Sequence, residues 1–118
     1  MSNTATVNLD TTELQPGDRL RGSAQWDVEK APRKISLRLF WHTKGKGTED
    51  VELVEEIEID SVPSNPHYAF DFALPVCPYS FSGSLISLEW GVELIVGRTI
   101  DKAAFTMAPN RVPLSLSR

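Results

Sequence analysis

The sequence predicts an all-β fold: an antiparallel β-sandwich of about seven to eight strands. Apolar side chains recur at every second residue in almost every segment, which is the period of a strand with one buried face. No segment has a convincing helical period, and prolines and glycines separate the alternating segments at the spacing typical of sandwiches and barrels. A chain of 118 residues suits one domain. We assign residues 1–108 to a single sandwich and expect residues 109–118 to form a loosely held tail.

The first two predicted strands are joined by a turn with a clear chemical signature. Residues 4–9 form a first strand with little apolar content. Residues 18–28 form the second, in which Leu20 and Trp26 share the inward face. Between them, Gln15–Asp18 reads QPGD. Proline fixes φ at the second turn position and glycine accepts a positive φ at the third, so these residues predict a type II turn.

The third and fourth predicted strands form a hairpin. Residues 33–42 and 50–60 flank the sequence TKGKGTED, whose glycines are typical of a hairpin loop. Apolar residues alternate with acids in the fourth strand, and we place all of them on the inward face: Val51, Leu53, Ile57 and Ile59. Glu55 falls in the apolar phase, so we predict a β-bulge or break near Val54 and Glu55.

A proline-bounded passage divides the second half of the chain. A strand at residues 67–74 leads into Pro75 and Pro78, which cannot donate to a sheet ladder. The chain re-enters a sheet near Leu85 as its longest alternating strand, which ends at about residue 96 and precedes a last strand at residues 99–107. In a sandwich, such a passage is how a chain crosses from one layer to the other.

Composition argues against several classes of partner and setting. The formal net charge is −4, whereas nucleic-acid binding rewards clustered lysines and arginines. A single cysteine excludes an internal disulfide, and neither a signal peptide nor a transmembrane segment is visible. We therefore expect a cytoplasmic protein that binds no nucleic acid.

Several motifs, in their order along the chain, resemble the arrestin-like superfamily. They lie in the segments LQPGDRLRGSAQWDV, ISLRLFWHTKGKG and YAFDFALPVCPYSFSGSLISLEWGVEL, and the similarity covers roughly residues 7 to 107. The residues that carry it are Pro16, Gly17, Asp18, Leu74, Pro75, Pro78, Ser80, Gly83 and Trp90. The resemblance implies an immunoglobulin-like β-sandwich and adaptor or scaffold work without catalysis.

The chain departs from that family in two respects. Arrestin-like proteins usually carry two sandwiches, and this sequence accommodates one, so it holds no cradle between domains. The first predicted strand, residues 4–9, also lacks the basic residues with which receptor-binding arrestins sense phosphate. The resemblance therefore does not extend to receptor recognition.

Three residues are candidates for an interaction site. Phe40 lies on the polar face of its predicted strand, where an aromatic side chain can anchor a partner, although single exposed aromatics are also ordinary surface. Lys44 and Lys46 alternate with glycines in the hairpin loop, and exposed backbone N–H groups beside them could receive an anion. The alternative to anion binding is that the loop is an ordinary solvent-exposed hairpin tip.

The acidic fourth strand has a structural explanation. Outward Lys34 and Arg38 of the third strand are expected to lie opposite Glu58 and Glu56, where opposite charges contribute roughly 0.2–1 kcal/mol per pair. A Ca²⁺ site is the less favoured reading, because no turn gathers the carboxylates around one point. The three tryptophans, Trp26, Trp41 and Trp90, all fall on inward phases and are expected in the core.

No constellation for catalysis or metal binding stands out. His42 and His67 have no partner at zinc-ligand spacing, and Cys77 is expected to be a small filler that is buried or half-buried. We therefore expect no enzyme activity, no cofactor and no metal site.

The predicted function is protein binding, by strand addition at an open sheet edge or by docking on a sheet face. The alternative is a ligand-binding module for an anionic headgroup or a sugar. Because one domain could regain a two-sandwich cradle by self-association, we also expect a homodimer.

Overall fold

A computed structural model describes residues 3–28, 34–45, 48–59, 67–83, 86–109 and 114–116. This part of the chain folds into strands with no helix. The strands are β1 (Thr4–Leu9), β2 (Glu13–Leu14), β3 (Arg19–Asp27), β4 (Ile35–Gly45), β5 (Thr48–Ile59), β6 (His67–Ala73), β7 (Phe81–Gly83), β8 (Ile86–Val96), β9 (Thr99–Met107) and β10 (Leu114–Leu116). The prediction of about seven to eight strands corresponds to the strands of six or more residues. The short strands β2, β7 and β10 have two or three residues, which is too few to show alternation.

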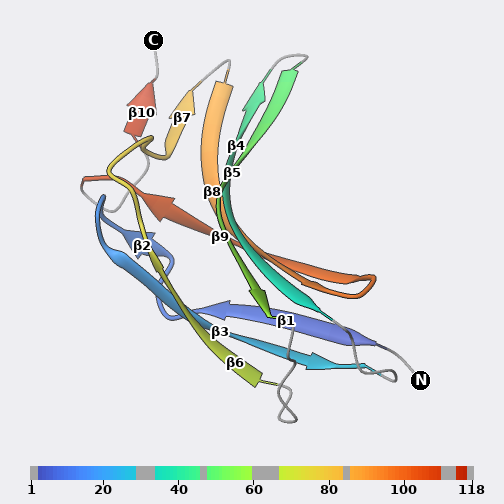
Figure 1. Ribbon diagram of the computed structural model, residues 1–118. Coiled ribbons are helices and arrows are strands. Elements are labelled where there is room, and N and C mark those ends of the chain that lie inside the picture. The colour runs from blue at the N-terminus through green and yellow to red at the C-terminus, as the bar shows by residue number, and fades with distance from the viewer. Residues whose placement is uncertain are drawn as a thin grey trace.

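The strands form two sheets that pack as a sandwich (Figure 1). The smaller sheet has the order β1-β3-β6. The larger has the order β10-β7-β8-β4-β5, with β9 paired to β8 and β2 paired to β9. Figure 1 shows β4, β5 and β8 bending strongly, with the smaller sheet on the convex side. The other face of the large sheet therefore lies on the inside of the bend and faces away from the smaller sheet.

The predicted alternation defines the core. Every second residue of β3 is buried, and the long strand β8 buries its predicted face from Leu88 to Val96. Trp90 is fully buried and Trp26 is nearly so, whereas Trp41 is partly buried and packs against the core from the side. The prediction that the indole rings are inward is thus confirmed, with Trp41 at the margin.

The turn at Gln15–Asp18 and the start of the crossing are hydrogen-bonded to each other. Gly17 has a φ of 83°, and the Asp18 N–H donates to the Gln15 carbonyl at 3.1 Å, as the predicted type II turn requires. The Leu74 N–H donates to the Asp18 carbonyl at 2.9 Å, and the Gly17 N–H donates to the Pro75 carbonyl at 3.2 Å. Two motifs of the family resemblance are therefore one structural unit.

The proline-bounded passage does cross between the layers, because β6 belongs to the smaller sheet and β7 and β8 to the larger. The buried indole of Trp90 donates to the Pro78 carbonyl at 2.8 Å. Ser80 is bonded to Met107 twice: its N–H donates to the Met107 carbonyl at 2.8 Å, and its hydroxyl accepts from the Met107 N–H at 3.0 Å. These bonds hold the irregular passage against the middle of the large sheet.

The predicted charge pairs between β4 and β5 are present. Arg38 lies opposite Glu56 at 2.8 Å, and Lys34 contacts Glu58 at 2.8 Å. The hydrogen bond to Glu56 raises the pKa of Arg38, and the hydrogen bond from Lys34 lowers the pKa of Glu58. Water screens both pairs, because Lys34, Glu58 and Arg38 are 52%, 47% and 43% exposed and Glu56 is 25% exposed. The pairs therefore mainly reinforce the register.

The C-terminal strand β10 lies at the edge of the large sheet that is opposite to β5. Strand β10 pairs in parallel with β7, and the pair forms one edge of the large sheet while β5 forms the other. How firmly residues 109–118 are held stays a prediction. Among the described residues, no helix is long and apolar enough to cross a membrane.

Candidate functional site

Phe40 lies on the outward face of β4, as the sequence predicts, and this face is the concave side of the bent large sheet (Figure 1). It is half-buried, and its ring lies across Gly91 of the neighbouring strand β8. A Cβ at position 91 would stand 2.8 Å from Phe40 Cζ, so a larger residue there would displace the ring. Phe40 also stacks on His42, with ring centroids 6.0 Å apart. Glycine thus creates the space in which an outward aromatic ring is held flat on the sheet.

The β-bulge in β5 places two further apolar residues beside Phe40. The register between β4 and β5 shifts between Leu39 and Phe40, so that Val54 has no partner, and the predicted bulge is confirmed. One extra residue reverses the side-chain direction on one side of it. Leu53 lies opposite Phe40 and Val51 lies opposite His42, on the concave face.

The prediction that Val51 and Leu53 share the inward face of Ile57 and Ile59 is therefore wrong. Val51 is 64% exposed and Leu53 is 49% exposed, whereas Ile57 and Ile59 pack against the core. The sequence contained the information needed to predict this, because a bulge next to Glu55 places the side chains on its two sides in opposite phase. Apolar residues occur at alternate positions on both sides of the bulge, and this pattern suggested a single inward face.

These residues line a shallow hollow of about 220 Å³. Its apolar floor comes from Phe40, Val51 and Leu53, and its polar rim comes from Arg38, His42, Glu49, Glu93 and Lys102. Glu93 stands 4.0 Å from Arg38 and 3.9 Å from Lys102, so the rim charges at that end largely neutralise one another. We call this surface the concave hollow.

Strand β5 borders the hollow and is an edge of the large sheet in the described part of the chain. Asp50 and Glu52 lie opposite Thr43 and Trp41, and Glu55 lies opposite Leu39, so the three carboxylates share the face that is opposite to the hollow. All three are exposed. No cation among the described residues forms an ion pair with them.

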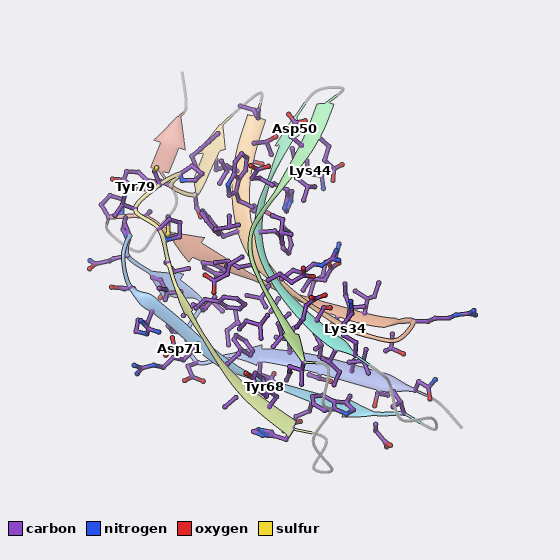
Figure 2. All side chains as sticks on the ribbon, in the orientation of Figure 1. Lys34, Lys44, Asp50, Tyr68, Asp71 and Tyr79 are labelled. Atoms are coloured by element: carbon purple, nitrogen blue, oxygen red, sulfur yellow. The ribbon has the colours of Figure 1, made fainter. Side chains whose placement is uncertain are left out.

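Of the two candidate lysines, the structure describes Lys44, which is not among the residues that line the hollow. Lys44 is exposed and lies opposite Glu49, a direct neighbour of opposite charge. Figure 2 shows Lys44 and Asp50 together at the end of the β4–β5 hairpin that is far from Lys34. Lys46 lies outside the described residues. The role of this loop in anion binding stays a prediction.

The other residues considered for chemistry are the two histidines and the single cysteine. No group of three or more histidines, cysteines or acids among them could hold a metal ion. His42 stands 3.5 Å from Glu89, and His67 is exposed on β6. Cys77 is exposed, so its predicted role as a buried or half-buried filler is wrong. It follows the proline that ends β6 and lies in the crossing, outside either sheet.

Comparison with solved structures supports the sandwich. Spo0M, a sporulation control protein from Bacillus subtilis, superposes with a TM-score of 0.61 and 13% identity over 92% of this chain. The chain spans half the length of that protein, 50% of which is matched. A β-glucosidase from Listeria innocua, in complex with gluconolactone, has a TM-score of 0.49 and 11% identity over 90% of this chain and 16% of its own.

The likeness to Spo0M establishes the fold of the chain, an all-β sandwich. No family model matches the sequence, and no curated protein matches it either.

Proposed function

We propose that this chain is a non-catalytic, arrestin-like module that binds another protein through the concave face of its large sheet. The observation that carries the proposal is the concave hollow, where Leu53 and Val51 are 49% and 64% exposed beside the half-buried Phe40. Adjacent exposed apolar side chains ringed by polar groups are typical of a protein interaction surface. An aromatic ring held in place by its neighbours is the kind of residue that dominates binding energy.

The arrangement of motifs is consistent with the family resemblance. The turn at Gly17 and the crossing at Pro75 bond to each other, and Trp90 holds the crossing at Pro78. These contacts give a structural reason for the motifs to occur together. The cytoplasmic setting and the homodimer remain part of the proposal. Light scattering at high protein concentration tests the dimer, and a monomer under those conditions would contradict it.

The experiment compares two matched variants in affinity purification from the native cell extract, followed by quantitative mass spectrometry. Leu53→Asp places a charge in the hollow, and Val76→Asp places one in the crossing between the sheets, where Val76 is 68% exposed. We expect Leu53→Asp to lose partners that the unmodified chain and Val76→Asp retain, by about tenfold or more. Equal recovery with both variants, or no specific partner for the unmodified chain, would overturn the proposal.

A further inference from the structure

We infer that the occupant of the concave hollow is an extended segment of another protein, in which basic and apolar residues alternate, and that it binds by adding a strand to β5. The inference rests on the proposed function and specifies its partner. Strand addition requires an open edge, and β5, with 12 residues, is the edge of the large sheet in the described part of the chain. Main-chain hydrogen bonds would supply affinity, and the side chains on the two faces would supply specificity.

The two faces of β5 have different chemistry before the bulge. Val51 and Leu53 point to the concave hollow, and Asp50 and Glu52 point to the opposite face. An added strand places its own side chains alternately beside these two sets. Apolar residues of the partner would cover Val51 and Leu53, and the intervening residues would meet carboxylates.

The carboxylates select basic residues in the partner. Asp50, Glu52 and Glu55 are exposed on one face, and no described cation forms an ion pair with them. By contrast, Glu56 and Glu58 on the other side of the bulge are already paired with Arg38 and Lys34. The acids for which the structure describes no cation partner thus lie beside the exposed apolar side chains of β5.

Two other occupants fit less well. In a second copy of the chain, β5 pairing with β5 would bring acidic side chains against acidic side chains, and like charges directly opposite are destabilising. The C-terminal strand β10 of the same chain is already placed, because it pairs with β7 at the opposite edge of the sheet. A separate protein with basic residues is therefore favoured over both.

The test uses the full chain and a synthetic peptide of about six residues, a common strand length, in which lysine and valine alternate. Binding is followed by NMR of the ¹⁵N-labelled protein, because the amides of residues 49–54 report on this edge directly. We expect saturable shifts concentrated there, with a dissociation constant of about 1 mM or tighter. A peptide with glutamate in place of lysine should bind at least about tenfold more weakly.

Two variants of the chain separate local from overall charge. Asp50→Lys with Glu52→Lys reverses the carboxylates beside the hollow and should weaken binding of the lysine peptide by about tenfold or more. The matched control, Asp10→Lys with Asp27→Lys, changes the net charge equally at exposed acids outside β5 and should weaken it by less than about threefold. Equal weakening by both pairs would show that only the overall charge matters and would overturn the inference.

Methylation of the peptide backbone tests strand addition itself. Alternate N–H groups of a strand point to the same edge. Of two peptides, one N-methylated at its lysines and the other at its valines, one should lose binding and the other should keep it. Retained binding of both, or no shift of the amides of residues 49–54 by the parent peptide, would overturn the inference. If Leu53→Asp nevertheless loses protein partners, the proposed function survives with a different mode of docking.

Discussion

The carboxylate of Asp101 accepts a hydrogen bond from the backbone N–H of Val7 at 2.8 Å, and so joins the two sheets of the sandwich. Val7 belongs to β1, at the edge of the smaller sheet, and Asp101 belongs to β9 in the larger. Val7 is 5% exposed, so its N–H has little access to water. A side chain of one sheet thereby satisfies an edge donor of the other, which closes this side of the sandwich.

We predict that Asp101→Ala lowers the free energy of unfolding by about 1.5–3 kcal/mol, because it removes a charged acceptor and leaves the Val7 N–H unpaired. Chemical denaturation measures the loss, and hydrogen exchange at the Val7 amide should become faster. Asp101→Asn is the matched control, because its amide oxygen can still accept the bond. If Asn and Ala cost the same, the hydrogen bond is not the source of the stability.

We predict that Gly91→Ala destabilises the protein by about 1–3 kcal/mol, because the added methyl group would meet the ring of Phe40. Combining it with Phe40→Ala should cost less than the sum of the two single changes, because removal of the ring relieves the clash. A double-mutant cycle in urea measures this coupling. Strictly additive effects would contradict the packing of Phe40 over Gly91.

We predict that Ser80→Ala costs about 1–3 kcal/mol, because it leaves the buried N–H of Met107 without its acceptor. Ser80 is 3% exposed, so water cannot readily replace the lost hydroxyl. Ser82→Ala, at an exposed position of β7, is the control and should change stability by less than about 0.5 kcal/mol. Similar losses for both variants, in thermal or chemical unfolding, would show that the bond to Met107 is unimportant.

We predict an acid-dependent contribution from the pair of Lys34 and Glu58. The pKa of Glu58 is lowered in the folded state, so its contribution is complete above the ordinary glutamate pKa of about 4.3 and is lost as the pH falls through the folded-state value. The melting temperature of Glu58→Gln should lie slightly below that of the unmodified chain near neutral pH, and the difference should vanish in acid. In a Lys34→Gln background, Glu58→Gln should change the melting temperature by less, because the hydrogen-bonding partner of Glu58 is gone. An undiminished difference in that background would show that the pair is not its source.

Alternation along the chain was sufficient to predict much of the sandwich. The first and last long strands, β1 at Thr4–Leu9 and β9 at Thr99–Met107, have the expected bounds. The type II turn at Gly17 also follows from local chemistry, because proline and glycine restrict or permit particular backbone angles wherever they occur. Such features depend on residues close together in the sequence.

The candidate site was only partly predictable. Phe40 was expected on the outward face, and its exposure to the hollow follows from phase alone. The neighbours that turn it into a site come from β5, where the bulge at Val54 reverses the direction of Val51 and Leu53. The direction of these two side chains depends on which residues of β4 they pair with, and that pairing cannot be predicted from the sequence of β5 alone.

Two layers with apolar inner faces, and the place where the chain crosses between them, follow from local sequence features, because a period of two and the missing N–H of proline act locally. Contacts between distant strands bring the turn at Gly17 to the crossing at Pro75, place Gly91 beneath Phe40, and leave β5 as an edge in the described part of the chain with Val51 and Leu53 exposed. Those relationships join strands far apart in the chain, and the register of the sheets sets them.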